Sequence, residues 1–223
     1  MTGEAPQRCF IQTEQSLCNV TSEVTSMNIK LKTASLVFVL TLALALGGLA
    51  PAQSMDNMSM PGMTHTTQET NDLAKLSGKA FDRAFLSMMI AHHQGAIDMS
   101  KAVLNNVKDA QVKTWTKAVT GAQQKEITNM TAWLGTLGGV DKSWQTGMAK
   151  EMDGMLADLK ANKDSDAGFV SGMLPHHSSA IEMATLALQK SSDARVLGLA
   201  REIIRTQADE MYLYKQWLIK RGT

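Results

Sequence analysis

Apolar residues recur at helical spacing along most of the chain from residue 73 onward. Leu86, Ile90 and Ile97, for example, return at intervals of four and seven residues, which is the period of an amphipathic helix. Short segments rich in Asn, Gly and Ser interrupt the pattern and are typical of turns. The fold is therefore predicted to be all-α, with five helices at residues 73–105, 109–137, 143–161, 167–190 and 193–220.

The helical pattern also repeats itself after 84 residues. The segment from Phe85 to Met99 recurs as the segment from Phe169 to Met183, with Phe, Met, His-His, Ala-Ile and Met at matching positions. The helix that follows each segment carries a second shared pattern, Gln-(x2)-Glu. Two repeated helix pairs, at 73–137 and 165–220, with the helix at 143–161 as their connection, predict a ferritin-like four-helix bundle over residues 73–223.

The N-terminal part of the chain has a different character. In residues 27–52, Lys30 and Lys32 precede an apolar stretch over 34–49, which is followed by Ala50-Pro51-Ala52. This order is typical of a secretory signal peptide, and the apolar stretch is slightly short for a membrane-spanning helix of about 20 residues. We expect export to the periplasm or the extracellular space, with residues 1–26 as an over-extended start. Residues 53–72 lack any period and are expected to form a disordered arm.

Composition narrows the classes of function. The 22 Lys and Arg nearly balance the 21 Asp and Glu, and no basic run occurs, so we expect no nucleic-acid partner. Both cysteines, Cys9 and Cys18, precede the signal peptide, so the exported chain would contain none. Methionine is unusually frequent, with 16 residues, and any candidate chemistry has to account for it.

The repeated histidines are the strongest candidates for chemistry. Each His-His pair shares its helix face with methionines, and we expect it to face the Gln and Glu of the next helix. Imidazole and thioether ligands suit copper, because thioethers favour Cu(I) and imidazole also accepts Cu(II). The alternative is a purely structural cluster, in which the histidines satisfy buried Gln and Glu side chains. The candidate ligands are Met89, His92, His93, Met99, Glu126, Met130, Met173, His176, His177, Met183 and Glu210.

Methionine gathers a second time in the arm. A core methionine usually fills gaps between neighbours, but that role does not exist in a segment without a core. Closely spaced thioethers on a flexible chain can wrap Cu(I). By contrast, the methionines of the helix at 143–161 are spaced by helical turns and are predicted to pack in the core. The candidate ligands of the arm are Met55, Met58, Met60, Met63 and His65.

Two motifs point to a known family. Phe-(x3)-Met-(x2)-His-His-(x2)-Ala-Ile-(x)-Met and Gln-(x2)-Glu-(x6)-Trp-Leu each occur twice. With them, residues 73–223 resemble the family catalogued as domain of unknown function 305, whose best understood members include periplasmic copper-binding proteins of the CopM type. The resemblance implies a ferritin-like bundle and an exported copper-binding protein. It carries over as ligands the Met and His residues of the first motif, namely Met89, His92, His93, Met99, Met173, His176, His177 and Met183.

The leading hypothesis is therefore a non-enzymatic protein that sequesters Cu(I) or Cu(II), or hands it on to another copper-handling protein, in copper tolerance or homeostasis. The alternative from the enzyme class is a ferritin-like metal oxidase. Di-iron bundles use Glu-x-x-His motifs, and this sequence contains none. A third possibility is a structural or stress-related bundle without bound metal.

Overall fold

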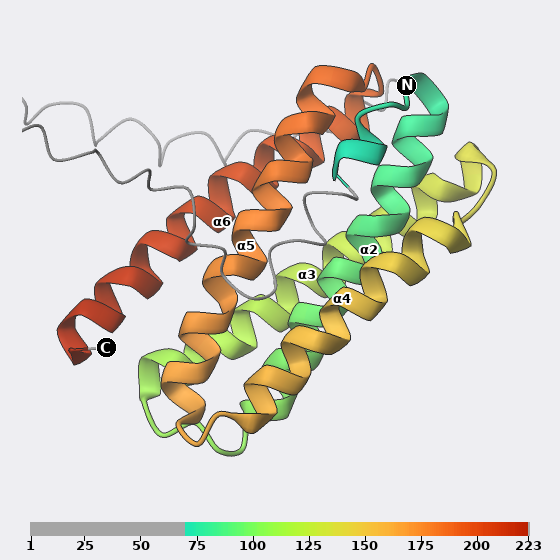
Figure 1. The fold of residues 1–223 in the computed structure, drawn as a ribbon. Coiled ribbons are helices and arrows are strands. Elements are labelled where there is room, and N and C mark those ends of the chain that lie inside the picture. Colours follow the sequence, from blue (N-terminus) through green and yellow to red (C-terminus); the bar gives the residue numbers. More distant parts are fainter. Residues whose placement is uncertain (1–69, 223) are drawn as a thin grey trace, which may run out of the picture. The chain divides into compact units, whose positions relative to one another are not determined.

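The computed structural model describes residues 70–222, and helices make up most of this part (Figure 1). The all-α prediction is confirmed, since the described residues contain no strand. None of the helices in this range is long and apolar enough to cross a membrane. The expected signal peptide, the residues before it and the methionine-rich part of the arm lie outside the described residues. The helices are α2 (Gly78–Val103), α3 (Ala110–Leu137), α4 (Lys142–Ala161), α5 (Ser165–Lys190) and α6 (Ala194–Arg221).

Aspartate caps the N-terminus of four of these helices. Asp109, Asp141, Asp164 and Asp193 each stand just before a helix and accept a hydrogen bond from a backbone N–H of its first turn. A side-chain oxygen at this position satisfies an amide that has no partner within the helix, which stabilises the helix by about 1 kcal/mol. These caps explain why the helix starts lie within two residues of the predicted starts for α3 to α6.

Helix α2 begins later than the sequence pattern predicts. The expected start was residue 73, whereas the helix begins at Gly78, after a separate helical turn at 70–73. Ser77 is extended and Gly78 has a φ of +56°, a conformation that favours glycine. Leu73 is nevertheless fully buried in the core. The apolar period therefore continued upstream of the helix because the short turn packs on the same core.

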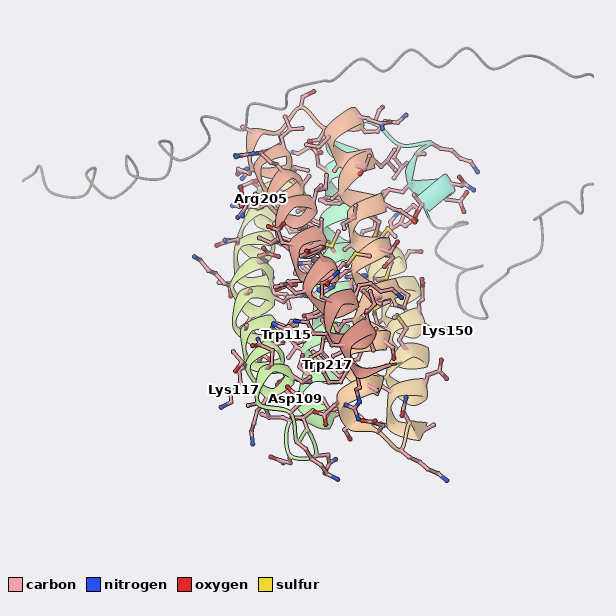
Figure 2. All side chains as sticks on the ribbon, turned by 90° about the vertical axis from the view of Figure 1, so that its left-hand side faces the viewer. Asp109, Trp115, Lys117, Lys150, Arg205 and Trp217 are labelled. Atoms are coloured by element: carbon pink, nitrogen blue, oxygen red, sulfur yellow. The ribbon has the colours of Figure 1, made fainter. Side chains whose placement is uncertain are left out.

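Helix α2 lies at the centre of the packing. It contacts α3, α4 and α5, while α6 packs against α5, and Figure 1 shows α2 between α3 and α4. Two hydrogen bonds show that α3 and α6 are antiparallel: Trp217 Nε1 donates to Asp109 Oδ2 over 3.2 Å, and Arg195 Nη1 donates to Thr136 Oγ1 over 3.3 Å. Figure 2 shows the first of these ends, where Asp109, Trp115 and Trp217 lie together.

The buried apolar side chains form two separate clusters along the bundle. On α2 the first cluster ends at Ala91 and the second begins at Ala96. On α5 the order is reversed, because the second cluster ends at Met173 and the first begins at Ala180. The gap between the clusters therefore falls at the two His-His pairs, in the middle of the bundle.

Candidate metal centre

A layer of polar side chains separates the two apolar clusters. All four histidines in it have no exposed surface, and Gln123 and Gln207 are 4% exposed. The glutamates reach toward solvent, with 24% of the Glu126 side chain and 29% of the Glu210 side chain exposed. We call this set the polar layer, and it consists of His92, His93, Gln123, Glu126, His176, His177, Gln207 and Glu210.

His92 and His176 meet where α2 and α5 cross. His92 Nε2 lies 3.1 Å from the backbone oxygen of His176, and His176 Nε2 lies 3.1 Å from the backbone oxygen of His92. The two ring centroids are 3.9 Å apart. Each repeat therefore supplies the acceptor that the histidine of the other repeat needs, and the crossing has approximate two-fold symmetry.

His93 and His177 turn toward the second helix of their own repeat. His93 Nε2 lies 2.6 Å from Glu126 Oε2, and His177 Nε2 lies 2.7 Å from Glu210 Oε2. The expected contact between each His-His pair and a glutamate is thus present in both copies. The expected hydrogen bond to glutamine is not formed through the amide oxygen. The side-chain oxygens of Gln123 and Gln207 have no hydrogen-bond partner in this part of the chain.

The hydrogen bonds determine which ring nitrogens remain free. A backbone carbonyl or a carboxylate can only accept, so we place a hydrogen on Nε2 of all four histidines. Their Nδ1 atoms are buried and have no hydrogen-bond partner within residues 70–222. Each of the four histidines therefore has one buried ring nitrogen without a partner, and unpartnered buried polar atoms of this kind call for an explanation such as an ion.

The central histidines are neutral at pH 7. Burial lowers the pKa of His92 and of His176 well below the usual 6.5, and the neighbouring imidazoles lower it further. Desolvation has this direction because it penalises the charged form of the ring. A neutral imidazole with a free lone pair is the form that binds a metal ion.

The predicted methionine ligands of the bundle are all buried, and they flank the polar layer on both sides. Met89, Met130 and Met183 belong to the first apolar cluster, whereas Met99 and Met173 belong to the second. In the second cluster the position equivalent to Met130 is Tyr214, whose ring centroid is 5.6 Å from that of His177. Its hydroxyl group is buried without a hydrogen-bond partner in the described range. The two sides of the layer therefore differ in chemistry.

The His, Cys, Asp and Glu side chains of the described residues do not form a complete metal site by themselves. No three His, Cys, Asp or Glu side chains in residues 70–222 lie close enough together to hold one ion. An ion in the polar layer would need thioether ligands or a rearrangement of side chains. One surface groove lies between α2 and α4 and another between α3 and α6, and none of the predicted ligands lines either of them.

Sequence reasoning missed one member of the site. Ser179 is 8% exposed and its Oγ lies 2.7 Å from His92 Nε2. The sequence does show that Ser179 is equivalent to Gly95 of the first repeat. Most candidate residues of the bundle are ones that the two repeats share, whereas this position differs between them. The candidate ligands Met55, Met58, Met60, Met63 and His65 lie outside the described residues, and their role stays a prediction.

The fold and the site together define a class, an all-α bundle with a buried histidine layer between methionine-bearing clusters. The family described as Domain of unknown function (DUF305) matches residues 19–134 and 166–223, and the chain belongs to this family. The unmatched residues between these two parts contain α4. The family match therefore covers both repeats and leaves out the helix that connects them.

Solved structures of CopM are similar to this chain. The Cu(II)-bound form is 28% identical with a TM-score of 0.54, over 62% of this chain and 97% of CopM. The Cu(I)-bound form is 27% identical with a TM-score of 0.55, over 64% of this chain and 98% of CopM. A DUF305 protein from Streptomyces coelicolor that is proposed to be secreted has a TM-score of 0.57 at 24% identity, over 64% of this chain and 94% of its own, and supports the fold alone.

A curated relative matches a shorter stretch. An uncharacterized protein of Acanthamoeba polyphaga mimivirus is 40% identical over 53 residues, which are 24% of this chain and 35% of that protein. The chain thus spans about a third of the length of this relative. The similarity to solved copper-bound structures suggests a metal-handling role for this chain.

Proposed function

We propose that this protein is exported and binds copper, without catalysing a reaction, in the polar layer of its bundle. The four buried Nδ1 atoms without a hydrogen-bond partner among residues 70–222 carry the proposal. Metal-ligating histidines usually donate their other ring N–H to a carbonyl or carboxylate, which fixes the ring and raises its basicity. All four histidines have this arrangement before any ion is bound.

The similarity to CopM supports copper as the metal. CopM structures hold Cu(I), Cu(II) and silver. The thioether and imidazole side chains of this protein are ligand types that suit the same ions. Thioethers favour Cu(I), which accepts two or three soft ligands, and imidazoles serve both oxidation states. We assign the Cu(I) ligands to His92 and His93 with Met89 and Met130 in the first half and to His176 and His177 with Met173 in the second. Met99, Met183, Glu126 and Glu210 complete the candidate set.

Export is part of the same proposal. Residues 27–52 have the order of segments that is typical of a signal peptide. An exported form beginning at residue 53 would contain no cysteine. Thioethers suit an oxidising compartment, because free thiols do not persist there. The methionine-rich arm would then act as a first binding segment for Cu(I).

A structural role for the polar layer is the second candidate. It is favoured by the absence, within residues 70–222, of three convergent His, Cys, Asp or Glu side chains. The reciprocal bonds between His92 and His176 already join α2 to α5, and such a contact needs no ion. This candidate predicts the same fold but no specific affinity for copper.

Equilibrium copper binding separates the two candidates. The exported form, residues 53–223, is titrated with Cu(I) under reductant and with Cu(II) in air against competing chelators. Variants carry Gln in place of His92 and His176, or of His93 and His177, so that the side chain stays polar and similar in size. Circular dichroism confirms that each variant folds. We expect each pair of substitutions to lower the copper affinity by at least tenfold.

Two further variants locate the binding. Changing His65 and the four arm methionines to Ser tests the arm by itself, and Met155→Leu is a control at a packing methionine of α4. Loss of copper only in the arm variant would place binding outside the bundle. An unchanged copper affinity in both histidine variants would refute the bundle site, and turnover of Fe(II) with oxygen would favour the oxidase.

A further inference from the structure

The two central histidines have different hydrogen-bond environments, although they occupy equivalent positions of the repeat. His92 Nε2 has two oxygen neighbours, the backbone oxygen of His176 at 3.1 Å and Ser179 Oγ at 2.7 Å. His176 Nε2 has only the backbone oxygen of His92, at 3.1 Å, among the described residues. The symmetry of the crossing is therefore broken on one side by a single hydroxyl group.

The hydroxyl of Ser179 has a defined direction. Its Oγ donates to the backbone oxygen of His176 over 2.9 Å, so its remaining role toward His92 is that of an acceptor. The Nε2–H of His92 is thus held by a second and closer oxygen. A stronger acceptor on one ring nitrogen makes the other nitrogen a better donor to a metal ion. The lone pair on His92 Nδ1 is consequently more basic than that on His176 Nδ1.

The packing of α4 explains why the first repeat has no such hydroxyl. The position equivalent to Ser179 is Gly95, and a Cβ atom there would lie 2.6, 2.7 and 2.9 Å from the Cγ, Cβ and Sδ atoms of Met152. Met152 belongs to α4 and is 3% exposed. A serine at this position would push α4 away from α2. The connecting helix therefore excludes from the first repeat the side chain that the second repeat provides.

We propose that Ser179 is a positioning residue that makes His92 the stronger ligand of the central pair, so that the first soft ion to enter the polar layer binds at His92 and not at His176. This inference rests on the proposed copper-binding function and adds an order of loading to it. The two halves of the layer fill in sequence because only His92 has a second oxygen acceptor among the described residues.

Nuclear magnetic resonance of ¹⁵N-labelled histidine tests the proposal in two steps. In the metal-free exported form, the Nε2–H proton of His92 should resonate downfield of that of His176, because it has the shorter acceptor contact. In Ser179→Ala the His92 signal should move toward the His176 signal, and Ser179→Thr, which keeps the hydroxyl, should restore it. Ser171→Ala is the matched control, since Ser171 Oγ donates only to the backbone oxygen of Gly168 on the same helix.

The second step adds Ag(I), a diamagnetic soft ion, in substoichiometric amounts. We expect the Nδ1 signal of His92 to shift before that of His176, and we expect Ser179→Ala to lower the affinity of the first site by about tenfold and to abolish the order. Equal shifts of both histidines in the wild-type protein, or an unchanged order in Ser179→Ala, would overturn the loading order while leaving silver binding intact. No shift of either histidine would overturn the loading order and the proposed function together.

Discussion

The two apolar clusters on either side of the polar layer are related by the repeat but are not copies of each other. The first contains six buried methionines and the second contains two among the described residues. Two of the six, Met148 and Met152, come from α4, which packs on α2 and has no equivalent on α5. The connecting helix therefore adds buried methionines to the first cluster only, while its partly buried Met155 packs against both clusters.

The hydrogen bonds among the eight residues of the polar layer, by contrast, are nearly the same in both halves, and the contact of His92 with Ser179 is the exception. The His–Glu distances differ by only 0.1 Å, and the two reciprocal bonds between the central histidines have equal length. A buried polar group must be satisfied wherever it lies, whereas an apolar neighbour can be exchanged at small cost if the volume is kept. We therefore expect the polar layer to tolerate few substitutions, whereas the two apolar clusters beside it can differ from each other in composition.

Acidification should destabilise the bundle more than any single change below. Burial holds the pKa of His92 and of His176 below 6.5 in the folded protein, so the unfolded chain binds protons first as the pH falls. The free energy of unfolding should therefore be nearly constant above pH 6.5 and decrease below it, by at most about 1.4 kcal/mol per pH unit for each of the two histidines. Urea unfolding at pH 7, 6 and 5 measures this loss.

Single substitutions show whether the two halves share that loss equally. His92→Gln and His176→Gln should each remove about half of the pH dependence. A free energy of unfolding that stays constant from pH 7 to 5 would mean that the histidines are not buried as neutral groups. A loss confined to one variant would break the equivalence of the two halves.

The proline of the second repeat offers a second way to test the comparison. Pro175 lies inside α5, which continues through it, and Ala91 is the equivalent residue of α2. Proline lacks a backbone donor and costs about 3 kcal/mol relative to alanine in a helix interior. We expect Pro175→Ala to raise the free energy of unfolding by about 1–3 kcal/mol and Ala91→Pro to lower it by at least as much. Loss of stability in Pro175→Ala would show that α5 needs the proline.

A pair of aspartates differs between the halves in a smaller way. Asp166 accepts hydrogen bonds from the backbone N–H groups of Lys108 and Asp109, whereas Oδ1 of the equivalent Asp82 is buried without a hydrogen-bond partner in the described part of the chain. Asp166→Ala should therefore cost about 2 kcal/mol. Asp82→Ala should change the free energy of unfolding by less than about 0.5 kcal/mol. Thermal and urea unfolding of both variants measure the difference, and equal losses would contradict it.

The smallest expected effect concerns metal preference and depends on the proposed function. Met130 and Tyr214 occupy equivalent positions beside the polar layer. Because a thioether favours Cu(I), Tyr214→Met should raise the Cu(I) affinity of the second half by up to about tenfold, or 1.4 kcal/mol. Met130→Tyr should lower that of the first half by a similar factor. Competition titrations measure both, and Tyr214→Phe is the control for the hydroxyl group.

Most of the fold could be predicted from the sequence because the relevant signals are local. Helical period and aspartate caps determine α3 to α6, and the repeat determines which helices form pairs. The start of α2 could not be predicted in the same way, because the turn at 70–73 buries Leu73 and extends the apolar pattern beyond the helix. Helix bounds depend on backbone conformation, which an apolar pattern does not encode.

Contacts within the site could be predicted from the sequence only where one side chain binds another side chain. The repeated His and Glu residues indicated their own contact. The bonds from His92 and His176 to backbone oxygens were not predictable, since every residue has a carbonyl group and the choice depends on how α2 and α5 cross. The role of Ser179 was not predictable for a related reason. The sequence shows that Ser179 is equivalent to Gly95, but only the structure shows that Ser179 contacts His92 and that Met152 leaves no room for a side chain at position 95.

The reciprocal histidine bonds make the two helix pairs depend on each other. Each pair lacks an acceptor for its own central histidine and finds one only in the other pair. A single pair would expose this histidine to water, so the N–H group can be buried only where two such pairs meet. The bundle thus has the geometry of a two-fold symmetric pair of helical hairpins that are joined in one polypeptide.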